Sequence, residues 1–154
     1  MKAHHYKVHI NWTGNRGTGT SGYTAYDRSH TLHIVGKVDI ACSSDTAFRG
    51  DATKHNPEEQ FLYSISSCHM LWYLHLCADA GIIVTAYEDE PTGVMEQETS
   101  GIGRFTGVTL HPKVQITNAE QLPLALQLHE KAHQFCFIAN SCNFPVTIHP
   151  LCRI

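Results

Sequence analysis

The order of apolar and polar residues predicts short strands near both ends of the chain. Residues 6–12 alternate apolar and polar side chains with a period of two, as in a half-buried strand. The turn-rich segment 13–20 follows, with three glycines and three threonines in eight residues. Further strands are expected at residues 23–26, 31–35, 37–41, 82–89, 93–98, 105–110, 113–117 and 144–149.

A helix is expected to begin sharply after Asn56. Asn56 is a favoured N-cap, and Pro57 suits the first helical position. Glu59 lies three residues after the cap, as in a capping box. A long apolar segment follows, and Gly81 is a suitable C-terminal stop.

A second helix is expected over residues 122–139, with Pro123 near its start. The predicted strands therefore surround two long helices, which indicates an α+β fold. The chain has 154 residues, a length that suits one domain with a substantial core. We expect a single domain over residues 1–154.

Composition and charge exclude several classes of partner. The sequence is 42% hydrophobic and 16% charged, as in globular domains, and its net charge is −3. Nothing in this balance favours nucleic acid or an anionic membrane. Serine, histidine and aspartate interrupt the apolar segment 61–83, so a buried helix is expected there rather than a membrane span. The N-terminus has no secretory pattern, and we expect a cytoplasmic protein.

Six cysteines, with no CxxC pair among them, are expected to be mostly reduced thiols. Cys68 and Cys136 each lie in an apolar helical segment, where a cysteine packs as a small apolar residue or serves as a thiolate. On a straight helix, Cys68 lies about three turns from the N-terminus, beyond the reach of the helix dipole. The serine-rich segment 64–67 favours a bend, which would place Cys68 near a new helix N-terminus.

Several motifs together make the chain resemble a known family. They are Trp12-Thr13-Gly14, Phe48-Arg49-Gly50-Asp51, Asn56-Pro57-Glu58-Glu59, Ser66-Ser67-Cys68-His69-Met70, the late Cys136 and Asn143-Phe144-Pro145-Val146. This combination resembles the OsmC/Ohr family, the osmotically inducible protein C and organic hydroperoxide resistance proteins. The resemblance extends over nearly the whole chain.

The resemblance implies an intertwined homodimer with two long central helices between β-sheets and active sites at the subunit interface. It also implies thiol-dependent reduction of hydroperoxides without haem, flavin or metal. Cys68 then corresponds to the peroxidatic cysteine, Cys136 to the resolving cysteine, and Glu58 to the glutamate that holds an essential arginine. For that arginine we favour Arg28 and Arg49.

Arg16, in the early turn region, is a further candidate for this arginine. The implied mechanism begins with attack of the Cys68 thiolate on the terminal peroxide oxygen. The resulting sulfenic acid condenses with Cys136, and an external dithiol or small thiol reduces the disulfide. The sequence leaves open whether the hydroperoxide is organic or inorganic, and which thiol is the reductant.

Two other functions are compatible with the same residues. His129, His133 and Cys136 fall at i, i+4 and i+7 of the second predicted helix, a spacing that could hold zinc with a fourth ligand from Cys68 or His69. Alternatively, the chain is a non-catalytic module that binds a small ligand in an apolar pocket. The aromatic and aliphatic residues for such a pocket, or equally for a core, are Trp72, Tyr73, Leu76, Phe135 and Phe137.

Overall fold

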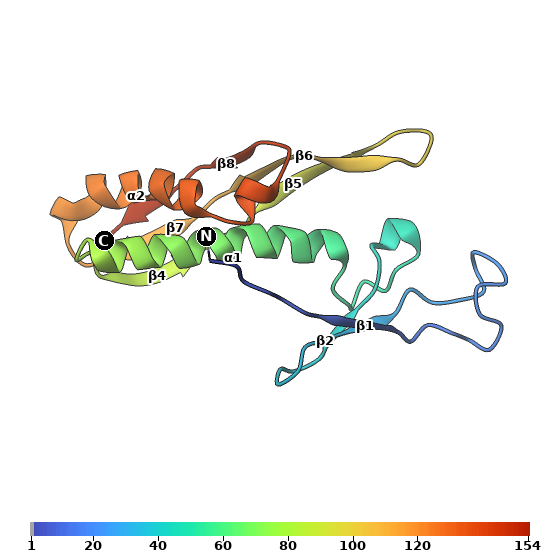
Figure 1. The fold of residues 1–154 in the computed structure, drawn as a ribbon. Helices are drawn as coiled ribbons and strands as arrows, with labels where there is room; N and C mark the ends of the chain where they lie inside the picture. The colour runs from blue at the N-terminus through green and yellow to red at the C-terminus, as the bar shows by residue number, and fades with distance from the viewer. Residues whose placement is uncertain (1) are drawn as a thin grey trace. The chain divides into compact units, whose positions relative to one another are not determined.

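The computed structural model describes residues 2–154 and has an α+β fold, as predicted (Figure 1). Its elements are β1 (His9–Trp12), β2 (His30–His33), β3 (Ile40–Cys42), η1 (Thr46–Phe48), α1 (Pro57–Asp79), β4 (Val84–Glu88), β5 (Thr92–Gln97), β6 (Gly103–Leu110), β7 (Lys113–Ile116), η2 (Ala119–Gln121), α2 (Leu122–Phe135), η3 (Ala139–Ser141), β8 (Val146–Ile148) and β9 (Leu151–Arg153). The chain forms two compact units, one that ends at Gln60 and one that comprises Phe61–Ile154.

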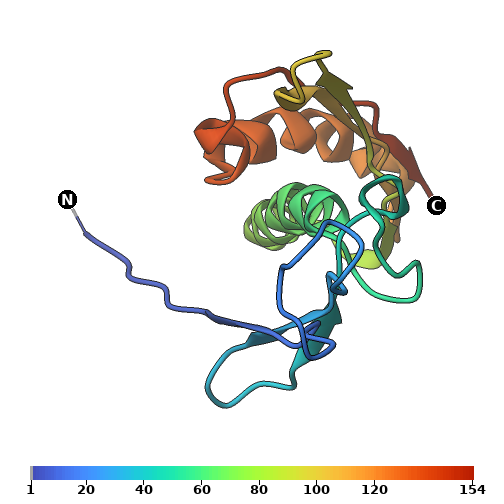
Figure 2. The ribbon, with the colours of Figure 1, turned by 90° about the vertical axis from the view of Figure 1, so that its right-hand side faces the viewer.

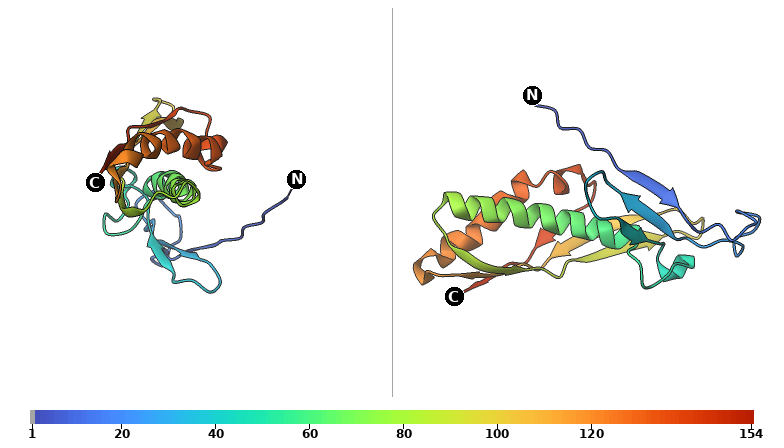
Figure 3. Two further views of the ribbon diagram at one scale, coloured as in Figure 1. Left: turned by 90° about the vertical axis from the view of Figure 1, so that its left-hand side faces the viewer. Right: turned by 90° about the horizontal axis from the view of Figure 1, so that it is seen from below.

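The first unit contains a three-stranded antiparallel sheet in the order β1-β2-β3, coloured blue in Figure 3. A long connection joins β1 to β2, and the strand predicted at residues 23–26 is absent from it. Instead, the Arg28 guanidinium donates hydrogen bonds to the carbonyl oxygens of Tyr23 and Tyr26, at 2.8 and 2.7 Å. A side chain satisfies these carbonyl groups, so the segment does not pair as a strand.

The start of α1 is a capping box, as the sequence predicts. The Glu59 backbone N–H donates to Asn56 Oδ1 at 2.8 Å, and the Asn56 backbone N–H donates to Glu59 Oε2 at 3.1 Å. At the other end, Gly81 has φ +70°, a conformation in which glycine ends a helix without strain.

Replacing Asn56 with alanine is expected to lower the free energy of unfolding by about 1 kcal/mol, because the reciprocal cap is lost. Urea unfolding followed by circular dichroism measures this change. Asn56→Asp, which keeps the acceptor oxygen, is the matched control and should stay close to the wild type. Equal stabilities for the alanine and aspartate variants would contradict a role for the cap.

The bend predicted in α1 is not found, because the helix runs without interruption from Pro57 to Asp79 (Figure 1). The hydroxyl groups of Ser64 and Ser67 donate to carbonyl oxygens one turn earlier on the same helix, those of Phe61 and Ser64. These bonds satisfy the serine side chains and leave the helix intact. Cys68 therefore lies in the helix interior and has no helix N-terminus beside it.

The second unit contains two mixed sheets with the orders β4-β7-β9 and β5-β6-β8. In each sheet, the first two strands pair antiparallel and the last strand, β9 or β8, adds in parallel. The pairing of β7 with β9 places Cys152 opposite Val114. The strand β9 was not predicted.

The two helices of this unit cross each other. Figure 2 shows α1 nearly end-on with α2 lying across it.

The helix α2 ends at Phe135, four residues earlier than predicted. Cys136 is its C-cap, with an extended backbone at φ −68° and ψ 104°. The Ala139 backbone N–H then donates to Cys136 Sγ at 3.4 Å, so the thiol itself holds the following turn. This early end moves Cys136 off the helix face that the sequence assigns to it.

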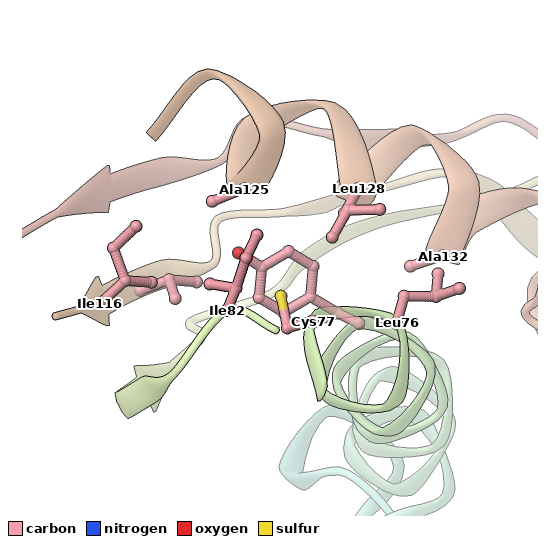
Figure 4. Packing of buried hydrophobic residues seen from close by; sticks show 9 residues of the cluster. Leu76, Cys77, Ile82, Ile116, Ala125, Leu128 and Ala132 are labelled. Atoms are coloured by element: carbon pink, nitrogen blue, oxygen red, sulfur yellow. The ribbon is translucent and has the colours of Figure 1, made fainter. Parts of the chain in front are cut away.

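Two apolar clusters form the core of the second unit. The larger one joins the C-terminal half of α1 to α2 and the β4-β7-β9 sheet, and Figure 4 shows Leu128 and Ala132 of α2 over Leu76 and Cys77 of α1. The smaller one packs α1 on the β5-β6-β8 sheet around Ile65. The middle of α1, where Cys68 lies, therefore joins the two clusters.

Candidate functional site

The two cysteines singled out from the sequence meet in the second unit, although 68 residues separate them. Cys68 lies mid-way along α1 and is half-buried, whereas Cys136 at the end of α2 is fully buried. The two thiols are near enough for Cys68 to raise the pKa of Cys136. All six cysteines are free in the structure. The fold thus brings an accessible thiol near a buried one.

The environment of Cys136 keeps its thiol protonated. Burial raises the pKa of Cys136 to about 12, and the neighbouring Cys68 adds to the rise. The backbone N–H of Ala139 opposes this effect by donating to the sulfur. The Cys136 thiol lies 4.0 Å from the carbonyl oxygen of Ile65, as a weak donor. Cys136 is therefore suited to react second, after Cys68.

An apolar depression opens on the face of α1 that carries Cys68. Its volume is about 230 Å³, and its lining comprises Leu71, Trp72 and His75. These residues follow Cys68 by three, four and seven positions, so all four share one helix face. The Trp72 ring stacks on Phe135 with centroids 5.1 Å apart. An accessible thiol thus lies beside an aromatic surface.

The other predicted site residues belong to the unit that ends at Gln60. Arg28 lies over the rings of Tyr23 and Tyr26, at 4.3 and 4.2 Å from their centroids. Arg49 follows η1 in a left-handed conformation with φ 66°. Arg16 donates to carbonyl groups of its own turn and lies 3.7 Å from Asp27.

Glu58, in the first turn of α1, has a buried oxygen, Oε2, that accepts no hydrogen bond within residues 2–154. Buried carboxylate oxygens normally have a donor, since an unmade bond costs the desolvation of the charged group. The roles of Glu58, Arg28 and Arg49 stay predictions from the family resemblance.

A buried pair of histidines was not predicted as a unit. His69 Nε2 and His129 Nδ1 are 3.0 Å apart, and the two side chains are 1% and 2% exposed. Burial lowers the pKa of His69 to about 4 and that of His129 to about 3, so both are neutral at pH 7. Sixty residues separate them, so no local pattern reveals the pair.

The zinc site considered from the sequence is not formed. Within residues 2–154, no three side chains of histidine, cysteine, aspartate or glutamate are grouped to hold a metal. His129 is instead engaged with His69, and Cys136 lies beyond the end of α2. The predicted i, i+4, i+7 face is lost because the helix ends before its third member.

Within residues 2–154, no helix is both long and apolar enough to cross a membrane.

Comparisons with known proteins agree with this architecture. A curated relative, the uncharacterized protein YmaD of Bacillus subtilis (strain 168), is 23% identical over 147 residues, which cover 92% of this chain and 88% of YmaD. A solved OsmC-like protein of unknown function from Vibrio cholerae is 26% identical with a TM-score of 0.87, over 97% of this chain and 100% of that one.

An organic hydroperoxide resistance protein from Elizabethkingia anophelis has the same fold, with a TM-score of 0.67, at 19% identity over 99% of this chain and 98% of that one. The family model described as OsmC-like protein matches residues 50–150. This match includes the thiol pair and both helices, and it covers more than half of the chain. The chain therefore belongs to the family of OsmC-like proteins.

Proposed function

We propose that this chain is a cysteine-based hydroperoxide reductase that works through Cys68 and Cys136. The observation that carries the proposal is the proximity of an accessible thiol on α1 to a buried thiol that caps α2, near enough for the first to raise the pKa of the second. Membership in a family whose members include organic hydroperoxide resistance proteins supports it. The difference in exposure assigns Cys68 to the first step and Cys136 to the second.

In the first step, the Cys68 thiolate attacks the terminal oxygen of the hydroperoxide, and the O–O bond breaks. Cys68 becomes a sulfenic acid, and the leaving alkoxide takes a proton to become an alcohol. In the second step, the Cys136 sulfur attacks the Cys68 sulfur. A disulfide forms, and the sulfenic hydroxyl leaves as water with the proton of Cys136. An external dithiol or two small thiols then reduce the disulfide.

The surroundings of Cys68 favour an organic hydroperoxide as the substrate. The depression lined by Leu71, Trp72 and His75 offers apolar contact to an alkyl or aryl group beside the thiol. Hydrogen peroxide has no group that would use this surface. Burial of apolar area is worth about 25 cal/mol per Å², so an aryl group of ordinary size gains a kilocalorie or more.

Replacing Trp72 with alanine is expected to lower kcat/KM for an aryl hydroperoxide about tenfold, because about 1.4 kcal/mol of apolar contact is lost. The value for hydrogen peroxide should change much less. Steady-state consumption of cumene hydroperoxide and of hydrogen peroxide, measured side by side, gives the two ratios. Equal losses for both substrates would contradict an organic-selective surface.

A homodimer is part of the proposal. Tyr63 and Leu71 of α1 are 71% and 62% exposed, and exposed apolar side chains of this size favour an interaction surface. The buried Glu58 Oε2, which has no donor among residues 2–154, supports the same conclusion, because an arginine of a partner subunit could donate to it. Arg28 and Arg49 remain the candidates for this arginine.

Stoichiometric oxidation tests the proposed function directly. One equivalent of cumene hydroperoxide should remove two of the six thiols and form one disulfide, located by mass spectrometry between Cys68 and Cys136. Consumption should continue when a dithiol such as dihydrolipoamide is added. If no hydroperoxide is consumed with any dithiol, the apolar depression favours the alternative, a small-ligand-binding module without catalysis.

A further inference from the structure

The hydrogen bond between His69 and His129 joins α1, which carries Cys68, to α2, which ends directly before Cys136. His69 directly follows Cys68 on α1, and His129 lies seven residues before Cys136 on α2. Within residues 2–154 it is the one hydrogen bond that links the side chains of α1 to those of α2. The remaining contacts of α2 with α1 in this region are apolar or aromatic: Ala125, Leu128 and Ala132 belong to the core cluster, and Phe135 stacks on Trp72.

Apolar contacts hold two helices together without fixing their rotation tightly, because they have no preferred direction. A hydrogen bond of 3.0 Å between buried rings does have one. A rotation of about 20° moves a side chain at the helix surface by roughly 1–2 Å. Disulfide formation accepts only a narrow range of separations, with Cβ atoms about 3.5–4.5 Å apart.

The surroundings of the pair fix the orientation of the His129 ring, and the hydrogen bond to His129 orients His69. The His129 ring stacks on Tyr73 with centroids 3.8 Å apart, and its Nε2 lies 3.8 Å from Cys152 Sγ. The two imidazole planes are within 11° of parallel. On the far side, His69 Nδ1 is buried and has no partner within residues 2–154. Within the described residues, the hydrogen bond to His129 is therefore the one hydrogen bond of the His69 ring.

We propose that His69 and His129 are positioning residues for the thiol pair, whose mutual hydrogen bond sets the rotation of α1 and α2 so that Cys68 and Cys136 can form a disulfide. This inference rests on the proposed redox pair, and it assigns the histidines no contact with the substrate. The two histidines act on the thiol pair indirectly, by setting the positions of α1 and α2.

The two amide side chains of different length provide a matched test at each position. Asparagine at 129 puts its amide near the place of Nδ1 and keeps the bond to His69, whereas glutamine puts it near Nε2 and keeps only the contact with Cys152. At position 69 the preference is reversed: glutamine matches Nε2, which bonds His129, and asparagine matches the unpartnered Nδ1. All four variants are polar and similar in size.

The measurement is the equilibrium between the Cys68–Cys136 dithiol and its disulfide in glutathione buffers, which gives the effective concentration of one thiol toward the other. His129→Asn and His69→Gln should stay within about threefold of the wild type. His129→Gln and His69→Asn should lower the effective concentration about 10- to 100-fold, as expected for a misplacement of about 1 Å. Leu128→Ala, which weakens packing on the same face, controls for lost stability.

Equal values for the two amides at position 129 would overturn the proposal, and so would a loss in Leu128→Ala as large as that in His129→Gln. A wild type that forms no Cys68–Cys136 disulfide in these buffers would overturn it as well. The assay contains no hydroperoxide. A wild type with a normal disulfide equilibrium but no hydroperoxide consumption would therefore contradict the proposed function and leave the positioning role standing.

Discussion

Replacing Cys68 with serine is expected to lower hydroperoxide consumption about 10³-fold or more, the scale on which removal of a nucleophile acts in other enzymes. A serine hydroxyl does not ionise near neutral pH and cannot carry the sulfenic acid that stores the transferred oxygen. The ferrous–xylenol orange assay with cumene hydroperoxide measures the loss. Activity in this variant above one tenth of the wild type would contradict Cys68 as the attacking thiol.

The same substitution at Cys136 is expected to act differently. Its thiol is buried and has a pKa raised to about 12, so it does not compete for the hydroperoxide. Cys136→Ser should therefore still react once, leave a sulfenic acid on Cys68 that dimedone traps, and then turn over slowly with a dithiol. Cys142→Ser, which removes a half-buried thiol with no part in the mechanism, is the control and should behave like the wild type.

The free energy of unfolding is expected to fall steeply between pH 7 and pH 5. The pKa values of His69 and His129 are lowered to about 4 and about 3, against an ordinary value of 6.5 in the unfolded chain. Between pH 6.5 and pH 4, the unfolded chain thus binds two protons that the folded chain excludes. Stability from these groups is complete above pH 6.5 and is lost as the pH falls.

The size of this loss in the free energy of unfolding follows from the coupling between proton binding and unfolding. With the folded histidines still neutral at pH 5, each of them costs roughly 2 kcal/mol on going from pH 7 to pH 5, or about 4 kcal/mol for the pair. Urea unfolding at the two pH values measures the difference. The double variant His69→Gln, His129→Asn carries no titratable group at either position and should lose most of this dependence. If the variant and the wild type showed the same slope, other groups would have to cause it.

The thiol pair also shows what a local sequence pattern can and cannot predict about a functional site. The motifs around Cys68 and Cys136 single out both residues, but their proximity depends on how α2 packs on α1, which no local pattern contains. The end of α2 is a similar case. The apolar pattern favours a helix to residue 139, yet the sulfur of Cys136 accepts a hydrogen bond from Ala139 and holds a turn there instead.

The sequence by itself determined the sharp start of α1, its end just before Gly81, the α+β class and the choice of the two cysteines. These features depend on neighbours within a few residues: a cap and its acceptor, a glycine with positive φ, or an apolar period. Only the tertiary structure decided the parallel strand β9, the straightness of α1 and the bond between His69 and His129. Each of these features depends on residues that are distant in the chain. Burying a polar group among such residues changes the free energy of folding by more than local conformational preference does.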